Sequence, residues 1–351
     1  MSSWSLPGAW RERSGPFIHT ANAVMPAGSR AAMPALPVAR IVGRLQLVTS
    51  WPVGIDPTGI YIDFLAQRRE RSSFNDTAPR WKKTMSNPEN VLDKIVATKR
   101  IEIEQARAAR PLAELRRELP DAPPVRDFFT ALAGEGQIKL IAEVKKASPS
   151  AGIIVKNFNH LDIAKLYIEN GAPFLSVLTE EDFFLGKLDH IKNIKSNYKI
   201  PILCKDFFID TYQVALAKSF GADCILIILS AVDKVLAKDL CQAANDLNIS
   251  TLIEVHSEKE AEIALSFKDS LIGINNRNLN TLEVSLNTSV KLSKILNSHQ
   301  NPLICESGIH STDNIKFIID NAGIYNFLIG ESLLKNQDIG SKLKQFTQIS
   351  L

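Results

Sequence analysis

The sequence has few cysteines, no long apolar run and little net charge. Its four cysteines show no close pair of the kind that binds zinc or shuttles electrons, and three of them (Cys204, Cys224 and Cys305) fall inside apolar runs. We therefore expect reduced core cysteines in a cytoplasmic protein. No run is long enough to span a membrane, and a net charge of +3 favours neither nucleic acid nor a charged surface as a partner.

Residues 1–84 differ in composition from the rest of the chain. They hold all four tryptophans and 8 of the 17 prolines, with 11 Lys and Arg against 5 Asp and Glu. No helical or strand period is sustained there, so we expect a disordered extension, with residues 85–351 as the folded domain. A transit peptide, and an over-long reading frame upstream of Met85, both remain open explanations.

A second change in composition falls near Gln137. Before it there are 15 Arg and 4 Lys, and from it onward 1 Arg and 21 Lys. The change could mark a junction between two parts of different coding bias. Helices are predicted on the amino-terminal side of this junction, from residue 87 to about 110, from Pro111 to 119, and near 125–133.

Beyond residue 137 one unit repeats. Short apolar, β-branched runs alternate with amphipathic helical stretches, and the runs occupy residues 138–144, 174–178, 201–205, 223–229, 251–255, 271–275, 302–306 and 326–329. Eight strand–helix units predict a parallel (β/α)8 TIM barrel, with the helix from residue 87 as an extra amino-terminal element. An open doubly wound sheet is the alternative, but it would normally show a glycine fingerprint after its first strand, and residues 148–152 are not one.

Polar residues terminate these apolar runs. Glu143 and Lys145 are two apart at the end of the first run, so they point to the same side of a strand. Further polar residues at or just after strand ends are Ser148, Lys205, Glu254, Asn275, Arg277, Glu306, Ser307 and Glu331. In a barrel these ends meet at one mouth, where unpaired charges are costly. Their convergence favours an active site over separate structural ion pairs.

Other site types find little support in the sequence. The histidines from His160 onward show no metal-ligand spacing, Ser307 has no histidine on its own or a neighbouring strand end for a hydrolase triad, and no Gly-Lys-Ser/Thr phosphate loop occurs. Glycines Gly308 and Gly330 follow the last two strands, where a barrel commonly holds phosphate on backbone N–H groups. Phe184 and Phe207 follow strand ends and could face a flat apolar substrate.

The strand-end blocks resemble those of the indole-3-glycerol phosphate synthase family of tryptophan biosynthesis. The similar blocks stand in the family's order and are 141–150 (IAEVKKASPS), 175–181 (LSVLTEE), 201–207 (PILCKDF), 252–254 (LIE), 273–277 (GINNR), 306–308 (ESG) and 328–332 (LIGES). The resemblance implies closure of 1-(2-carboxyphenylamino)-1-deoxyribulose 5-phosphate to indole-3-glycerol phosphate, with loss of CO₂ and water. It implies no metal or organic cofactor.

The resemblance also implies roles for the strand-end residues. Lys205 matches the general acid, and Lys145 a second catalytic lysine oriented by Glu143. Glu254 matches a carboxylate that moves protons while the hydroxyl leaves. The remaining matches are hydrogen-bonding positions at Asn275, Glu306 and Ser307, substrate contacts at Ser148, Phe184, Phe207 and Arg277, and phosphate contacts at Gly308, Gly330 and Glu331. Two lysines in one cleft are expected to lower each other's pKa.

Two rival interpretations stay open at this stage. One is another phosphosugar barrel enzyme, such as an isomerase or a Schiff-base aldolase, although Lys205 stands beside carboxylates rather than alone. The other is an inactive barrel that serves as a binding module. The expected partner is a small phosphosugar substrate, with no nucleic acid or membrane. We expect a monomer, and contact with other tryptophan-pathway enzymes is left open.

Overall fold

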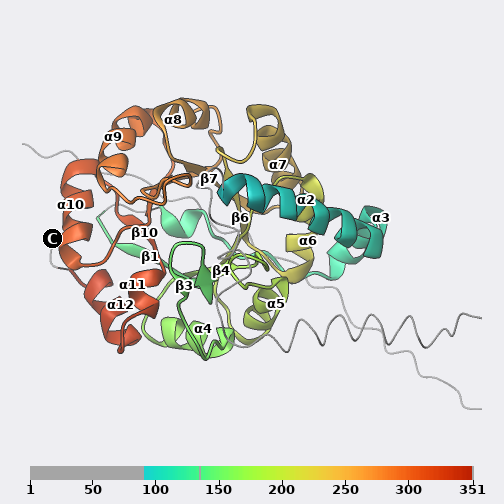
Figure 1. The fold of residues 1–351 in the computed structure, drawn as a ribbon, viewed down its shortest axis with the longest axis horizontal. Coiled ribbons are helices and arrows are strands. Elements are labelled where there is room, and N and C mark those ends of the chain that lie inside the picture. Colours follow the sequence, from blue (N-terminus) through green and yellow to red (C-terminus); the bar gives the residue numbers. More distant parts are fainter. Residues whose placement is uncertain (1–90, 134–135, 350–351) are drawn as a thin grey trace, which may run out of the picture. The chain divides into compact units, whose positions relative to one another are not determined.

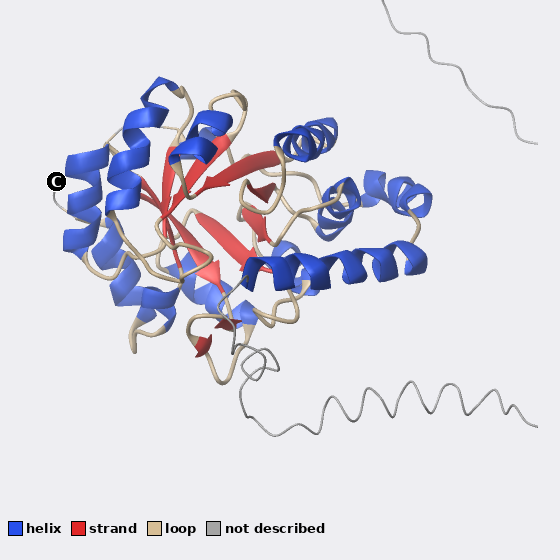
Figure 2. Cartoon of the chain, turned by 45° about the horizontal axis from the view of Figure 1, so that its top comes forward, coloured by secondary structure: helices blue, strands red, loops and turns tan. Residues whose placement is uncertain are grey.

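The computed structural model describes residues 91–133 and 136–349. Within them, parallel strands close a barrel in the order β1-β10-β9-β8-β7-β6-β5-β4, and Figures 1 and 2 show helices around this barrel. Strand β1 pairs with both β4 and β10, so the sheet has no free edge there and the open-sheet alternative is wrong. The expected disorder of residues 1–84 concerns a segment outside the described residues.

The barrel strands agree with the predicted runs to within one residue at each end. They are β1 (Lys139–Val144), β4 (Phe174–Leu178), β5 (Ile202–Lys205), β6 (Cys224–Ile228), β7 (Ser250–Val255), β8 (Leu271–Asn275), β9 (Leu303–Glu306) and β10 (Asn326–Ile329). A short antiparallel pair, β2 (Ala147–Ser148) and β3 (Gly152–Ile153), lies in the loop after β1. That pair is too short to give a sequence signal.

The helices of the barrel follow the strands. They are α4 (His160–Glu169), α5 (Leu188–Asn197), α6 (Thr211–Phe220), α7 (Lys234–Asp246), α8 (Glu258–Ala264), α9 (Asn287–Ile295), α10 (Thr312–Ala322), α11 (Glu331–Leu334) and α12 (Ile339–Thr347), with a 3-10 turn η4 (Leu296–Ser298). Several have the expected end signals. Asp210 and Gln213 form a capping box at the start of α6, and Gly221 ends it with φ of 95°.

The amino-terminal elements follow the prediction except in one segment. Helices α2 (Val91–Ala109) and α3 (Leu112–Glu118) are separated at Pro111, and a 3-10 turn, η2 (Leu119–Asp121), follows. The predicted helix near 125–133 is wrong, because only η3 (Thr130–Leu132) forms there. Pro123 and Pro124 precede this segment, and the backbone N–H of Arg126 bonds to Asp223 rather than to a helical carbonyl. Figure 1 shows α2, in teal, lying beside the barrel rather than following a strand.

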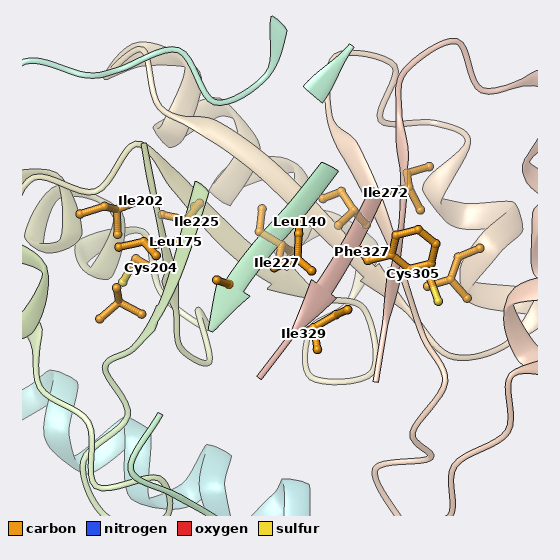
Figure 3. Close-up of a cluster of buried hydrophobic side chains, with 14 of the residues drawn as sticks. Leu140, Leu175, Ile202, Cys204, Ile225, Ile227, Ile272, Cys305, Phe327 and Ile329 are labelled. Carbon is orange, nitrogen blue, oxygen red and sulfur yellow. The ribbon is translucent and has the colours of Figure 1, made fainter. Parts of the chain in front are cut away.

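The core has two parts, because alternate residues of each strand face opposite sides of the sheet. One row packs against helix residues, and Figure 3 shows Leu140, Leu175, Ile202, Ile225 and Phe327 of this row as sticks. The other row fills the barrel and includes Ile141, Leu203, Leu226, Leu252, Ile304 and Leu328. At the carboxyl end of each strand, the last residue of the inner row therefore faces the mouth of the barrel. No helix of the described ranges is long and apolar enough to cross a membrane.

Candidate active site

A pocket lies at the carboxyl ends of the barrel strands. Fourteen sequence-predicted residues line it: Glu143, Lys145, Ser148, Phe184, Lys205, Phe207, Glu254, Asn275, Arg277, Glu306, Ser307, Gly308, Gly330 and Glu331. Three apolar residues of α2, which the sequence did not suggest for the site, complete one wall: Val91, Leu92 and Ile95. The structure thus brings every predicted site residue to one cavity.

The convergence follows from the alternation of the strands. Leu203 is in the inner core and Cys204 in the outer core, so Lys205 returns to the inner row. The same alternation places Glu143, Glu254, Asn275 and Glu306 on the inner row of their strands. Asn275 and Glu306 are in register on neighbouring strands, and Glu254 is in register with Gly273, two residues before Asn275. The polar residues at the pocket floor are therefore the top layer of the barrel's own core.

Lys205 sits between two carboxylates at the pocket floor. Its Nζ donates to Glu254 Oε2 and to Glu306 Oε2, at 3.0 Å in each case. Both glutamate side chains are buried, and that of Lys205 is 15% exposed. Among the described residues, Glu306 Oε1 has no hydrogen-bond partner. The cluster therefore holds one buried carboxylate oxygen whose hydrogen-bonding capacity the described residues do not satisfy.

The electrostatics of Lys205 differ from the sequence expectation. Burial disfavours its charged form, but the carboxylates of Glu254, Glu306 and Glu143 outweigh this effect, and the pKa of Lys205 is raised. The expectation that two lysines would lower each other's pKa is wrong for Lys205. Opposite charges are nearer and more numerous than the like charge of Lys145. Lys205 is therefore charged and carries a proton to donate.

The two glutamates beside Lys205 differ in proton affinity. Burial and the negative charge of Glu254 raise the pKa of Glu306 to about 8, despite the nearby Lys205. Burial also opposes ionisation of Glu254, but Lys205 and His256 outweigh it, and the pKa of Glu254 is lowered. Glu306 therefore holds a proton to higher pH than Glu254 does. Neighbouring carboxyl groups with separated pKa values are a common basis for acid and base roles.

Two glycines leave space for the carboxylates of Glu306 and Glu143. A Cβ at Gly273 on β8 would overlap Oε1 of Glu306, and a Cβ at Gly330 would overlap the side chain of Glu143. Glu143 in turn forms an ion pair with Lys145. The sequence predicts Gly330 as a phosphate contact, and that role is untested. The space that both glycines leave was not apparent, because it depends on contacts between strands.

The turn after β9 has an unusual backbone. Ser307 and Gly308 both have positive φ, at 64° and 84°, and this conformation is costly for serine. The amide nitrogen of Asn276 supports the turn by donating to the carbonyls of Glu306 and Ser307, at 3.0 and 3.1 Å. Successive backbone N–H groups in such turns can form an anion site. This geometry is compatible with the predicted phosphate contact at Gly308.

An ion pair spans the pocket rim between β8 and β10. Arg277 Nη2 lies 3.7 Å from Glu331 Oε2, and Arg277 Nη1 donates to the carbonyl of Leu282 at 3.1 Å. The Glu331 carboxylate also pairs with Lys335. The side chain of Glu331 thus holds Arg277 in place at the rim. The backbone N–H of Glu331 lies at the start of α11 and is the group predicted to contact phosphate.

Two phenylalanines form the aromatic wall. The rings of Phe184 and Phe207 are 6.1 Å apart and tilted by 41°. Glu180 holds the first of them in place, because its carboxylate accepts the backbone N–H groups of Phe183 and Phe184 at 2.7 and 2.9 Å. Burial raises the pKa of Glu180 to about 7. The sequence placed Glu180 at a strand end but gave it no role.

Helix α2 is fastened to the site by a buried lysine. Lys99 Nζ lies 2.9 Å from Asp206 Oδ1, and Thr179 donates to Asp206 Oδ2 at 2.6 Å. Asp206 directly follows Lys205, so the helix that closes the pocket is tied to the strand that carries the lysine. Sequence reasoning missed Lys99. Its position on the same helical face as Leu92, Ile95 and Ile103 was the available signal.

The fold and the site define a class of protein. Acid, base and cationic side chains meet at the carboxyl ends of a (β/α)8 barrel, beside a turn suited to phosphate and an aromatic wall, as in barrel enzymes that act on phosphorylated small molecules.

Comparison with known proteins narrows the class. A sequence model of the family described as "Indole-3-glycerol phosphate synthase" matches residues 92–346. The indole-3-glycerol phosphate synthase of Trichodesmium erythraeum is 42% identical over 266 residues, which cover 74% of this chain and 89% of the relative. That of Polaromonas sp. is 44% identical over 260 residues, covering 73% and 97%. The chain belongs to the indole-3-glycerol phosphate synthase family.

Proposed function

We propose that this chain converts 1-(2-carboxyphenylamino)-1-deoxyribulose 5-phosphate into indole-3-glycerol phosphate, CO₂ and water. The observation that carries the proposal is the position of Lys205, charged and held between Glu254 and Glu306 at the pocket floor. An acid held between two carboxylates of different proton affinity suits a reaction that protonates one oxygen and later expels it as water.

Ring closure requires the ribulose carbonyl to become electrophilic. The ring carbon that bears the carboxylate attacks the carbonyl carbon, and Lys205 gives a proton to the carbonyl oxygen. The bond to the carboxylate then breaks, CO₂ leaves, and its electron pair restores the aromatic ring. Lys145, held by Glu143, is the cation placed to bind the substrate carboxylate before it leaves.

Dehydration completes the indole. The new hydroxyl leaves as water with a proton from an acid of the site, and the neighbouring CH₂ loses a proton to a base. Glu254 is the base in this proposal, because its lowered pKa keeps it ionised and able to accept a proton at neutral pH. Asn275, Glu306 and Ser307 would hold the hydroxyl groups of the substrate.

The rest of the pocket would bind the two ends of the substrate. Phe184 and Phe207 would contact the anthranilate ring, with Ser148 and Arg277 as polar contacts at the rim. Backbone groups at Gly308, Gly330 and Glu331 would hold the phosphate. We also propose, as in the sequence analysis, that the enzyme needs no cofactor and acts as a monomer in the cytoplasm.

The test mixes the purified full chain with the carboxyphenylamino-deoxyribulose phosphate and follows indole fluorescence. We expect turnover in the parent and a loss of at least about 100-fold in Lys205→Met, because a general acid is removed. A thermal melt of both proteins with and without phosphate serves as the folding control. A well-folded parent that gives no indole product would overturn the proposal and favour a different phosphosugar reaction or a binding role.

A further inference from the structure

His256 lies directly behind the proposed base and does not line the pocket. It follows β7, two residues after Glu254, and its side chain is 10% exposed. The ring Nε2 is 3.2 Å from Glu254 Oε1, the carboxylate oxygen that Lys205 does not use. Each oxygen of Glu254 therefore has its own nitrogen neighbour, one in the pocket and one behind it.

The other side of the ring faces a second carboxylate. His256 Nδ1 lies 3.4 Å from Glu260 Oε2 and 3.1 Å from the hydroxyl of Ser230, which comes from the loop after β6. The backbone N–H of His256 also donates to Glu260 Oε2 at 2.6 Å. Glu260 belongs to α8, so the ring is held between an element of the barrel and an element of the helical layer.

The acceptors on the two sides of the ring favour two N–H groups. Ser230 donates its single proton to Glu260 Oε1 at 2.9 Å, which leaves its oxygen as an acceptor toward Nδ1. Nε2 makes no hydrogen bond within the described residues, but it lies at ion-pair distance, 3.2 Å, from Glu254 Oε1, and an ionised Glu254 favours a positive charge there. A neutral imidazole has one N–H and could serve one side only, whereas an imidazolium serves both.

We propose that His256 is a positioning residue, an imidazolium clamped between Glu254 and Glu260 that fixes the proposed base and keeps it ionised. This inference rests on the proposed function, because it assigns His256 an effect on the base of that reaction. It acts through Glu254 rather than on the substrate. Glu260 and Ser230 hold the imidazole ring in place through its Nδ1 atom.

The charges that face the ring support this assignment. Glu254 comes from β7, Glu260 from α8, and beyond Glu254 stand Lys205 on β5 and Glu306 on β9. Burial would favour the neutral ring, but the two carboxylates outweigh it and raise the pKa of His256 to about 9. The same contacts lower the pKa of Glu260.

The first test reads the charge of the ring without turnover. The full chain, with ¹⁵N-labelled histidine, is titrated by NMR, and the His256 signal is assigned by its loss in His256→Gln. We expect the His256 ring to remain an imidazolium at pH 7.5. A neutral ring at that pH would overturn the proposal, whether or not the protein turns over substrate.

The second test is the pH profile of kcat and kcat/KM. Without the imidazolium, the pKa of Glu254 rises, so the base is lost at a higher pH and the acid limb moves upward. In His256→Gln we expect a shift of roughly one pH unit or more, with kcat affected more than KM. Glu260→Gln should move the limb in the same direction by less. If His256→Gln does not fold, Glu260→Gln alone tests the proposal.

The matched control is His299→Gln. His299 contacts the carbonyl of Ser270 at 3.0 Å, at the opposite end of the barrel, and should leave the acid limb in place. An acid limb that stays fixed in His256→Gln and Glu260→Gln, with both proteins folded, would overturn the clamp. An inactive parent would instead argue against the proposed reaction, and the NMR result would still decide the charge of the ring.

Discussion

Two of the buried lysine–carboxylate clusters in the described part of the chain behave in opposite ways. At the amino end of the strands, Lys195 of α5 pairs with Asp223, and both side chains are almost fully buried. At the carboxyl end, Lys205 lies between Glu254 and Glu306. Burial lowers the pKa of Lys195, which has one carboxylate partner and the like charge of Arg126 nearby. The carboxylates around Lys205 raise its pKa.

The clusters also differ in how completely their atoms are bonded. Both oxygens of Asp223 are used, since Oδ1 accepts from Lys195 and the N–H of Arg126, and Oδ2 accepts from the N–H of Ile202 at 2.8 Å. At the mouth, Glu306 Oε1 has no partner among the described residues. We call the first cluster closed, because its hydrogen bonds are complete, and the second open, because it lines the pocket and keeps one carboxylate oxygen without a hydrogen bond from the described residues. The presence of a lysine and its carboxylate partners does not by itself tell a closed cluster from an open one.

The largest expected effect is on the closed cluster. Asp223→Asn should lower the free energy of unfolding by about 3–5 kcal/mol, because it leaves the Lys195 charge buried without a partner. An amide also has a single acceptor oxygen, so its NH₂ would face one of the N–H donors that Asp223 satisfies. Urea unfolding measures the loss. A change below about 1 kcal/mol would contradict the structural role of the pair.

The next largest effect is expected on kcat, when a methyl group fills the space beside Glu306 in the open cluster. Gly273→Ala places a methyl group where Oε1 of Glu306 now lies, and this carboxylate is the end of a flexible side chain that can move. We expect kcat to fall about 10- to 100-fold, since small displacements of a reacting group are costly. Stability should change far less than in Asp223→Asn. Wild-type kcat in a folded Gly273→Ala protein would show that the position of Glu306 is unimportant.

The smallest expected effect is a gain in stability when the Glu306 carboxyl group of the open cluster is replaced by an amide. Because the pKa of Glu306 is raised from 4.5 to about 8, the folded state holds more protons than the unfolded state between these values, and stability falls as pH rises through this window. Glu306→Gln removes this dependence. At pH 8 it should be more stable than the parent by on the order of 1 kcal/mol, although it turns over more slowly. Parallel stability curves for the two proteins at pH 5 and pH 8 would disprove this.

The sequence predicted the barrel well because strand signals are local. Each apolar run ends within one residue of its strand, and the alternation within a run already states which residues share a face. For the same reason, the fourteen predicted site residues could be named before their positions were known. Their assembly in one pocket needed only the closure of the barrel, while their individual roles remain predictions.

What the sequence did not predict depends on contacts between distant segments. Lys99 meets Asp206 over more than one hundred residues of chain, and Gly273 matters because of Glu306 on the next strand. The pKa of Lys205 was predicted in the wrong direction, because the sequence shows two lysines in one mouth but not that three glutamates surround one of them. The sequence assigned His256 no role for a similar reason. Its partners come from β7, α8 and the loop after β6.

The alternation of inner and outer rows also limits how this site can be redesigned. The inner-row residues of each strand are spaced two apart, and the residue between them belongs to the contact with the helices. Inserting or deleting one residue inside a strand would exchange the two rows and turn the reactive groups toward the helical layer. New specificity is therefore accessible through substitutions in the inner row and through changes of length in the loops, whereas the length of each strand must stay constant.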